Sequence, residues 1–147
     1  MNNYIINENT LMLIPQEFNT SLIIEKDNEN IIANKCLNIV DYSCRFYGSS
    51  FNGRLAGTKF LTNFKYKCPI VISEKKEIIM FPTHSFKDNS CIWINPSAIK
   101  FTKGNDFSVE ILLKNNKKYL LNTSEFVINN QILKSSYLFS ILRSKNQ

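Results

Sequence analysis

Apolar residues in this chain occur in short runs separated by clusters of Asn, Asp, Pro and Ser, and this spacing limits the fold more than any other feature. Short runs bounded by turn-forming residues predict β-strands, and strands joined by short turns predict antiparallel hairpins. Trp93, the only tryptophan, falls in one such run and is expected in the core. The expected strands lie at 4–6, 11–14, 22–25, 31–33, 37–41, 69–73, 77–81, 91–95, 107–113 and 117–121.

Two segments show helical signals instead. Ser49 and Ser50 are candidate N-caps, and the apolar residues that follow them have helical spacing, which predicts a short helix. Ser124 is a candidate N-cap for a second helix over 125–142. The elements together predict an α+β fold, mainly an antiparallel sheet with a short central helix and a C-terminal helix. The apolar stripe of the C-terminal helix is expected to contain Phe126, Leu133, Tyr137 and Ile141.

Length and cysteine content limit the domain count and the cofactors. The chain has 147 residues, 44% of them hydrophobic, which is enough for one domain with its own core. No internal repeat or linker divides it, so residues 1–147 are expected to form a single domain. The four cysteines include no closely spaced pair, and His84 is the only histidine, so zinc-motif spacing is absent. We therefore expect reduced, buried thiols, no metal and no cofactor.

The sequence lacks the usual targeting signals. Its first residues do not combine a cationic flank with an unbroken apolar run, as a secretion signal does. No apolar segment approaches the roughly 20 residues that span a bilayer. We expect a cytoplasmic protein with no membrane partner.

The segment 43–58 is the densest in unusual residues, with two arginines, three glycines and several hydroxyls. Glycine weakens a helix or strand by roughly 0.5 to 1 kcal/mol relative to alanine, so this composition predicts a functional surface. Gly53 and Gly57 are four residues apart and share a helix face, where we expect tight packing against the sheet in preference to approach of a ligand. Arg54 is expected to project beside that face as an exposed side chain.

Motifs of catalysis are missing. The sequence has no Gly-x-Ser-x-Gly elbow, no Walker-type phosphate loop and no Gly-x-Gly-x-x-Gly after a strand. Cys44 and His84 are the remaining combination of nucleophile and base, but many small proteins contain one histidine and several cysteines without using them. We do not expect an enzyme, and no catalytic residue is assigned.

Positive charge is concentrated in the middle of the chain. The net charge is +6, and residues 45–73 contain no acidic residue, while their five cations alternate with aromatic and amide side chains. Cations and small donors suit phosphate binding, and Arg and Asn also enter the narrow minor groove of A/T-rich DNA. A solvated basic face and a stacking platform for single strands are the alternatives. The candidate DNA-binding residues are Arg45, Ser49, Ser50, Asn52, Arg54, Thr58, Lys59, Lys65 and Lys67.

The order and spacing of several motifs resemble a known family. The motifs lie at 39–41, 43–50, 53–54, 57–58, 67, 69–70, 81–83 and 91–94. Together they resemble the competence transcription factor ComK family of low-GC Gram-positive bacteria, most closely from 39 to about 99. The resemblance implies a cytoplasmic, nucleoid-associated activator of DNA-uptake genes that recognises paired A/T-rich boxes in double-stranded DNA. It also implies minor-groove contact and a homo-oligomer in which dimers form a tetramer on the promoter.

One departure separates this chain from longer members of that family. Those members continue past the final helix into a charged segment linked with activation and with capture by a Clp-protease adaptor, whereas this sequence ends at Gln147. DNA binding is therefore a firmer expectation than activation or adaptor binding. The alternative function is an interaction protein that modulates a full-length relative through mixed oligomers. The N-terminal hairpins and the final helix are both candidates for the oligomer interface.

Overall fold

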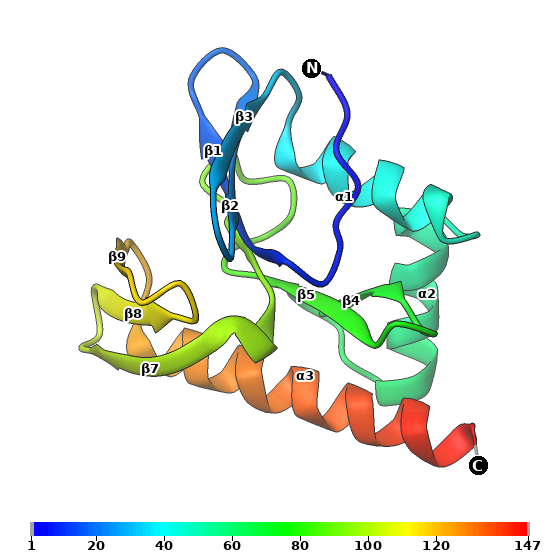
Figure 1. The fold of residues 1–147 in the computed structure, drawn as a ribbon. Helices are drawn as coiled ribbons and strands as arrows, with labels where there is room; N and C mark the ends of the chain where they lie inside the picture. Colours follow the sequence, from blue (N-terminus) through cyan, green and yellow to red (C-terminus); the bar gives the residue numbers. More distant parts are fainter. Residues whose placement is uncertain (1, 147) are drawn as a thin grey trace.

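Two antiparallel sheets and three α-helices form the part of the chain that the computed structural model describes, residues 2–146 (Figure 1). The larger sheet has the strand order β3-β2-β1-β6-β5-β4, and the smaller has the order β7-β8-β9. This arrangement confirms the predicted α+β class and the antiparallel sheet as its main body. The strand bounds are β1 Thr10–Gln16, β2 Thr20–Glu25, β3 Glu29–Ile32, β4 Ile70–Ser73, β5 Ile78–Pro82, β6 Trp93–Ile94, β7 Ile99–Gly104, β8 Val109–Leu113 and β9 Lys118–Leu121.

The larger sheet is covered on both faces, which explains its continuous apolar strands. Trp93 and Leu13 are neighbours across β6 and β1 and point into a core shared with the helices α1 (Cys36–Phe46) and α2 (Phe51–Thr62). Met12 and Ile94, one position along, point into a second core shared with the smaller sheet and the helix α3 (Glu125–Lys145). Alternate residues of one strand therefore serve two cores, as the two-residue period of a strand requires.

The strand predicted at 37–41 is wrong, because these residues belong to the helix α1. Ile39 and Val40 favour a strand by local propensity, and that local signal gave the wrong element. The buried positions are Cys36, Ile39, Val40, Ser43 and Cys44, which have the spacing of a helix face. Tertiary burial along that face overrides the preference of β-branched residues.

The strand predicted at 4–6 is also wrong. This segment pairs with no strand, and its polar backbone groups bond to side chains of α1 and its C-cap. The amide of Ile6 donates to Ser43 Oγ at 2.9 Å, and the hydroxyl of Tyr47 donates to the carbonyl of Ile6 at 3.0 Å. The N-terminal segment thus lies beside the helix that precedes the basic residues and is fixed to it.

Both predicted helices are present, but α3 is turned opposite to the prediction. Phe126, Leu133 and Tyr137 are exposed and Ile141 is half-buried, although the sequence pattern places all four in the core. Apolar residues occupy two opposite faces of α3, so periodicity alone selects the wrong one. The buried face contains Ile128, Gln131, Ser135, Leu138 and Leu142.

Candidate nucleic-acid interface

Asp41 joins the end of α1 to the start of α2. Its Oδ1 accepts the amide hydrogen of Phe51 at 2.9 Å, and its Oδ2 accepts Nε of Arg45 at 2.8 Å. The bond from the Phe51 amide, followed by the ion pair with Arg45, lowers the pKa of this carboxyl. Ser50 completes the joint as the predicted N-cap, accepting the amide of Gly53 at 3.0 Å. The start of α2 is therefore fixed relative to Arg45.

The helix α2 turns one face to solvent along its whole length. Phe51 and Thr58 face the core, while Asn52, Lys59 and Phe60 are exposed, with Phe60 at 85%. Burying such a ring would stabilise the fold by about 1.5–3 kcal/mol, yet Phe60 stays exposed, as Phe18 and Phe107 do elsewhere in the chain. The outer face of α2 therefore combines a cation, an amide and an unburied aromatic ring.

The loop after α2 continues this surface, and hydrogen bonds from side chains of α3 hold it in place. The side chain of Gln131, fully buried, donates to the carbonyls of Lys67 at 2.8 Å and of Pro82 at 2.7 Å. Lys134 Nζ donates to the carbonyl of Tyr66 at 3.1 Å. Lys65 and Tyr66 consequently stay exposed on a well-anchored loop. The term basic surface is used below for Arg45, Asn52, Lys59, Phe60, Lys65 and Tyr66.

The nine candidate DNA-binding residues fall into three groups by exposure. Four are exposed and belong to the basic surface, namely Arg45, Asn52, Lys59 and Lys65. Ser49, Ser50, Arg54 and Lys67 are half-buried at its margins. Thr58 is buried, and its hydroxyl donates to the carbonyl of Pro69 at 2.8 Å. The hydroxyl of Thr58 thus serves to hold α2 against the start of β4.

Arg54 is not the exposed side chain that the sequence predicts. It is half-buried and lines a cavity of about 190 Å³ between α2, β4 and the end of α3, together with Ser49 and Lys145. Its Nε is enclosed and has no hydrogen-bond partner among the described residues. Its charge contributes to lowering the pKa of Glu74, after the hydrogen bonds from Asn146 and Lys145 and the charge of Lys145. Arg54 therefore lines an internal cavity near Glu74, and it also lies beside the basic surface.

The two glycines of α2 do not pack closely against the sheet, which corrects the expectation from their spacing. A Cβ placed on Gly57 would meet no atom within 4 Å, and one on Gly53 would meet only the hydroxyls of Ser49 and Ser50. Both glycines line the same 190 Å³ cavity as Arg54. Their missing side chains leave open space beside α2, where the prediction expected a close backbone contact.

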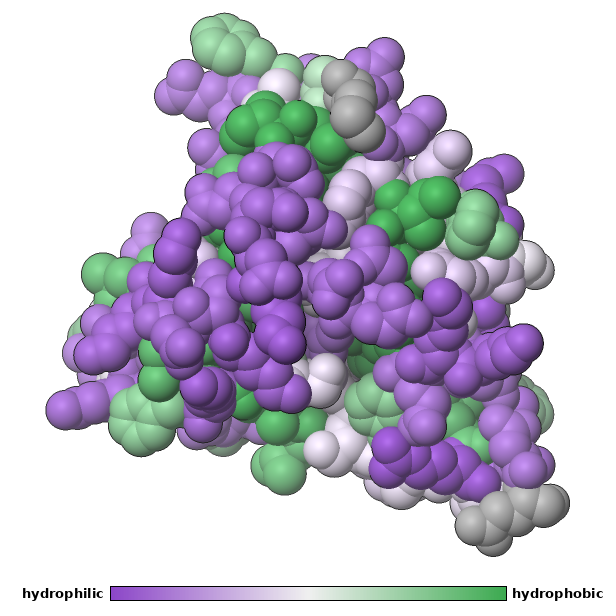
Figure 2. Space-filling model, in the orientation of Figure 1, coloured by the Kyte–Doolittle hydropathy of each residue, from purple (hydrophilic) through white to green (hydrophobic). Residues whose placement is uncertain are grey.

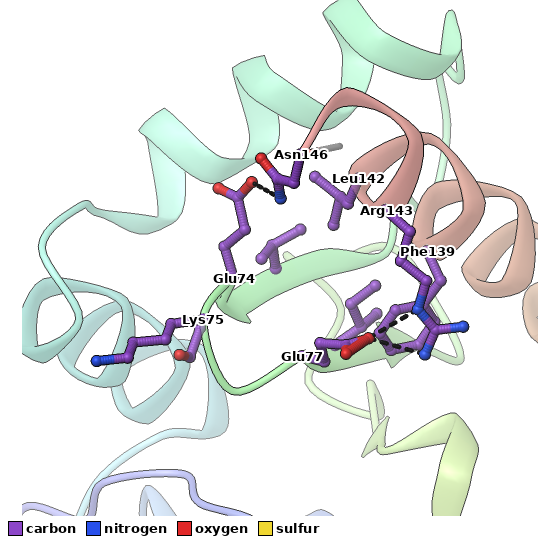
Figure 3. Close-up of a pocket in the computed structure, with 10 residues that line it drawn as sticks. Glu74, Lys75, Glu77, Phe139, Leu142, Arg143 and Asn146 are labelled. Atoms are coloured by element: carbon purple, nitrogen blue, oxygen red, sulfur yellow. Dashed lines mark hydrogen bonds and ion pairs between the residues drawn. The ribbon is translucent and has the colours of Figure 1, made fainter.

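The turn between β4 and β5 is bonded to the end of α3. Figure 3 shows Arg143 directed at Glu77 and Asn146 directed at Glu74 across a pocket of about 310 Å³. Arg143 donates from Nε and its terminal NH2 group to one oxygen of Glu77, at 2.8 and 2.7 Å, and Asn146 donates to Glu74 at 3.0 Å. Both acidic groups of the pocket are ion-paired, Glu77 with Arg143 and Glu74 with Lys145.

The fold adds one cation that sequence reasoning missed, Lys134. Lys134 and Lys59 both lie close enough to Cys68 to offset part of the rise that burial causes in its pKa. Lys134 comes from α3, about seventy residues away in the sequence, so no local pattern indicates it.

Figure 2 shows that the face of the molecule seen in that view is largely hydrophilic, with hydrophobic residues in separate patches.

The four cysteines are free thiols buried in the core. Burial raises the pKa of Cys44 to about 12, so its thiolate is scarce at neutral pH, and the ring of His84 bonds to Thr83 Oγ1 at 2.8 Å. Among residues 2–146, no group of three or more His, Cys, Asp or Glu side chains is placed to hold a metal ion. No helix within that range is long and apolar enough to cross a bilayer.

Comparison with known proteins gives the family. A model of the ComK protein family matches residues 1–147, and the chain belongs to that family. It is also 36% identical over 142 residues to a protein named competence transcription factor from Bacillus subtilis (strain 168). That alignment covers 94% of this chain and 74% of the relative. No solved structure matches the chain significantly. The resemblance inferred from the motifs is thereby confirmed.

Proposed function

We propose that this protein binds A/T-rich duplex DNA as a regulator of transcription of DNA-uptake genes, acting in the cytoplasm at the nucleoid. The observation that carries the proposal is the basic surface along α2 and its following loop, in a segment without acidic residues. Family membership and the name of the Bacillus relative support competence as the process that this binding serves. Recognition of paired A/T-rich boxes, largely through the minor groove, is part of the proposal.

The basic surface has the chemistry for two kinds of contact. Lys59 and Lys65 provide charges for phosphates, which give affinity without reading sequence. Arg45 and Asn52 are suited to a minor groove, whose narrow A/T-rich form concentrates negative potential. Exposed Phe60 is an apolar group of the kind that minor-groove proteins insert against base steps.

The remaining candidates are ranked by their exposure. Ser49, Ser50, Arg54 and Lys67 border the basic surface and are proposed as secondary contacts. Thr58 is left out of the proposed contact set because its hydroxyl is used inside the protein.

A binding comparison at fixed salt tests the proposal. Fluorescence anisotropy is measured with a duplex carrying paired A/T-rich boxes and with a G/C-rich duplex of equal length. Tighter binding to the A/T-rich duplex supports the proposal, and equal, weak binding to both contradicts it. Inserting about five base pairs, half a helical turn, between the boxes is expected to reduce cooperativity more than inserting about ten.

A second candidate is an interaction protein that joins a full-length relative in mixed oligomers without activating transcription. The exposed apolar face of α3 favours it, because such a face suits a protein partner. Equal, weak binding to both duplexes, with co-purification of a co-expressed relative, would select this function.

A further inference from the structure

Arg54 is a half-buried cation without an acid of its own. The other two arginines of the chain are each paired with a carboxylate, Arg45 with Asp41 and Arg143 with Glu77. Within residues 2–146, Arg54 forms no ion pair, and its enclosed Nε has no hydrogen-bond partner. Removing a charge from water is costly unless an opposite charge compensates it, so the environment of Arg54 favours an added anion.

Glu74, an acid beside Arg54, is already engaged by other groups. Its Oε1 accepts a hydrogen bond from the Asn146 side chain at 3.0 Å, seen in Figure 3, and pairs with Lys145 Nζ at 3.2 Å. Among the causes that lower the pKa of Glu74, the charge of Arg54 is the smallest. These three charged groups together leave one positive charge, which suits a ligand carrying a single negative charge.

The cavity beside Arg54 has a polar end and an apolar wall. Arg54 and the hydroxyl-bearing Ser49 lie at the polar end, and Gly57 contributes open space, since a Cβ built there would meet no atom within 4 Å. The apolar wall comes from α2, β4 and α3, and consists of Leu61, Val71, Leu138 and Leu142. The term Arg54 cavity is used for this space.

The volume of the Arg54 cavity sets the size of its ligand. The cavity measures about 190 Å³. An apolar protein cavity of about 150 Å³ is large enough to hold a benzene molecule. The Arg54 cavity therefore has room for one ring, or a branched aliphatic body of that size, with a small charged group attached.

We propose that the Arg54 cavity binds a small organic carboxylate whose apolar body is about the size of a benzene ring. The two terminal nitrogens of Arg54 hold the carboxylate, because a guanidinium and a carboxylate match as paired donors and acceptors. Ser49 donates a further hydrogen bond, and the body of the ligand lies against Leu138 and Leu142. This site goes beyond the proposed function, and its occupation requires no DNA.

Two other kinds of ligand match the Arg54 cavity less well. Inorganic phosphate carries up to two charges at neutral pH and has no apolar body, so it leaves the wall of Leu138 and Leu142 uncovered. A neutral ring of the same shape covers that wall but gives Arg54 no compensating charge. The combination of one unpaired cation with an apolar wall therefore selects a carboxylate with an apolar body.

A bound carboxylate would connect three elements of the fold. Arg54 belongs to α2, Val71 to β4 and Leu142 to α3, so one ligand contacts all three. A ligand that binds only the folded state raises its stability. Arg54 also borders the basic surface, so the ligand would neutralise one charge at that margin.

NMR titration of the whole chain without DNA tests the site independently of the proposed function. Benzoate is the probe and benzamide, of nearly the same shape and neutral, is the matched comparison, both at constant ionic strength. The N–H signal of Arg54 Nε is the local reporter, because its enclosure slows exchange with water. Benzoate is expected to shift this signal to saturation and to raise the melting temperature, whereas benzamide does neither.

Two variants locate the bound probe. Arg54→Gln is expected to raise the dissociation constant of benzoate more than about 10-fold. The matched control, Arg45→Gln, removes the same charge at an exposed position outside the cavity and is expected to leave that constant unchanged. Gly57→Leu fills the open space and is expected to abolish benzoate binding without lowering the melting temperature.

Three results would overturn the inference. They are equal binding of benzoate and benzamide, tighter binding of inorganic phosphate than of benzoate, and equal weakening in Arg54→Gln and Arg45→Gln. Melting curves verify that each variant is folded. If Arg54→Gln does not fold, Gly57→Leu decides, because a folded Gly57→Leu that binds benzoate as the wild type does would place the probe outside the Arg54 cavity.

Discussion

The outer faces of α2 and α3 are both exposed, and they differ in the partners they suit. The face of α2 carries Asn52, Lys59 and Phe60, so it presents charge and a ring together. The face of α3 carries Leu133 and Tyr137, and the one charged side chain beside them, Lys134, is bonded to the carbonyl of Tyr66. Charge attracts a polyanion at long range, while an uncharged apolar face gains stability only by contact with another apolar surface. One small fold thus carries the proposed DNA surface on one helix and an exposed apolar face on another.

The largest expected effect comes from removing the hydrogen bonds by which α3 holds the loop after α2. Gln131→Ala removes the donor that the carbonyls of Lys67 and Pro82 share, so a buried acceptor at Pro82 and a part-buried one at Lys67 lose this hydrogen bond. Each unsatisfied group costs about 1–3 kcal/mol, so the free energy of unfolding is expected to fall by about 2–4 kcal/mol. Urea denaturation measures it.

The control for that change is Asn130→Ala, the neighbouring residue on α3. Its side chain makes no hydrogen bond within the described part of the chain, and its loss is expected to change stability by no more than about 0.5 kcal/mol. An equal loss in both variants would show that the helix, and not the bonds of Gln131, is what the alanine disturbs.

The next largest effect is expected when two lysines are removed from the basic surface on α2 and the loop after it. Lys59→Ala with Lys65→Ala is expected to weaken binding to A/T-rich duplex roughly 10- to 100-fold near 0.1 M salt. The slope of log affinity against log salt is expected to fall by about 1.8, because each lost phosphate contact contributes about 0.9. Anisotropy titrations at several salt concentrations measure both quantities.

A second pair of lysines gives the matched control. Lys103→Ala with Lys114→Ala removes the same charge from the smaller sheet and the turn beside it, where both lysines are exposed. If this control weakens DNA binding as much as the first pair, net charge decides affinity and the basic surface has no special role.

The sequence predicted most of the strands but not the orientation of the helices. Short apolar runs are local signals, and most strands follow them, but no predicted run covers β7 (Ile99–Gly104) in the smaller sheet. The helix α1 was missed because Ile39 and Val40 resemble a strand locally, while its helical face extends from Cys36 to Cys44. The orientation of α3 places Gln131 in the interior, where its side-chain amide donates to carbonyls of residues 49 and 64 positions away. No local pattern contains that information.

The candidate site was predictable to a similar degree. Exposed cations such as Lys59 and Lys65 stand out in a segment without acids, so composition alone indicates them. The half-buried state of Arg54 and the internal bond of Thr58 depend on β4 and on the end of α3, which are brought together only in the fold.

A smaller effect concerns the start of α2. Asp41→Ala removes the acceptor for the Phe51 amide and the partner of Arg45, and is expected to cost about 1 kcal/mol at pH 7, as for loss of a helix cap. The pKa of Asp41 is lowered in the folded protein, so its contribution is present above the unfolded pKa of about 3.9 and is lost as pH falls through the folded pKa. The gap between wild type and variant should therefore narrow below about pH 4.

Urea denaturation at pH 7 and at pH 3 measures that gap. Asp106→Ala, at an exposed turn, serves as the control and is expected to change stability little at either pH. A gap that stays constant with pH would mean that the carboxylate form of Asp41 is not what stabilises the joint.

The smallest effect asks how far around α2 the surface for DNA extends. Gly57→Ala fills open space inside a helix and is expected to raise the free energy of unfolding by about 0.5–1 kcal/mol. Gly53→Ala should stabilise less, because its Cβ would lie 2.8 Å from Ser49 Oγ and 3.2 Å from the capping hydroxyl of Ser50. If DNA contacts only the outer face, Gly57→Ala leaves affinity unchanged while stability rises. A stabilised variant that binds A/T-rich duplex several-fold more weakly would instead mean that the DNA backbone approaches the glycine side, beside Arg54, and the basic surface would have to be extended to include it.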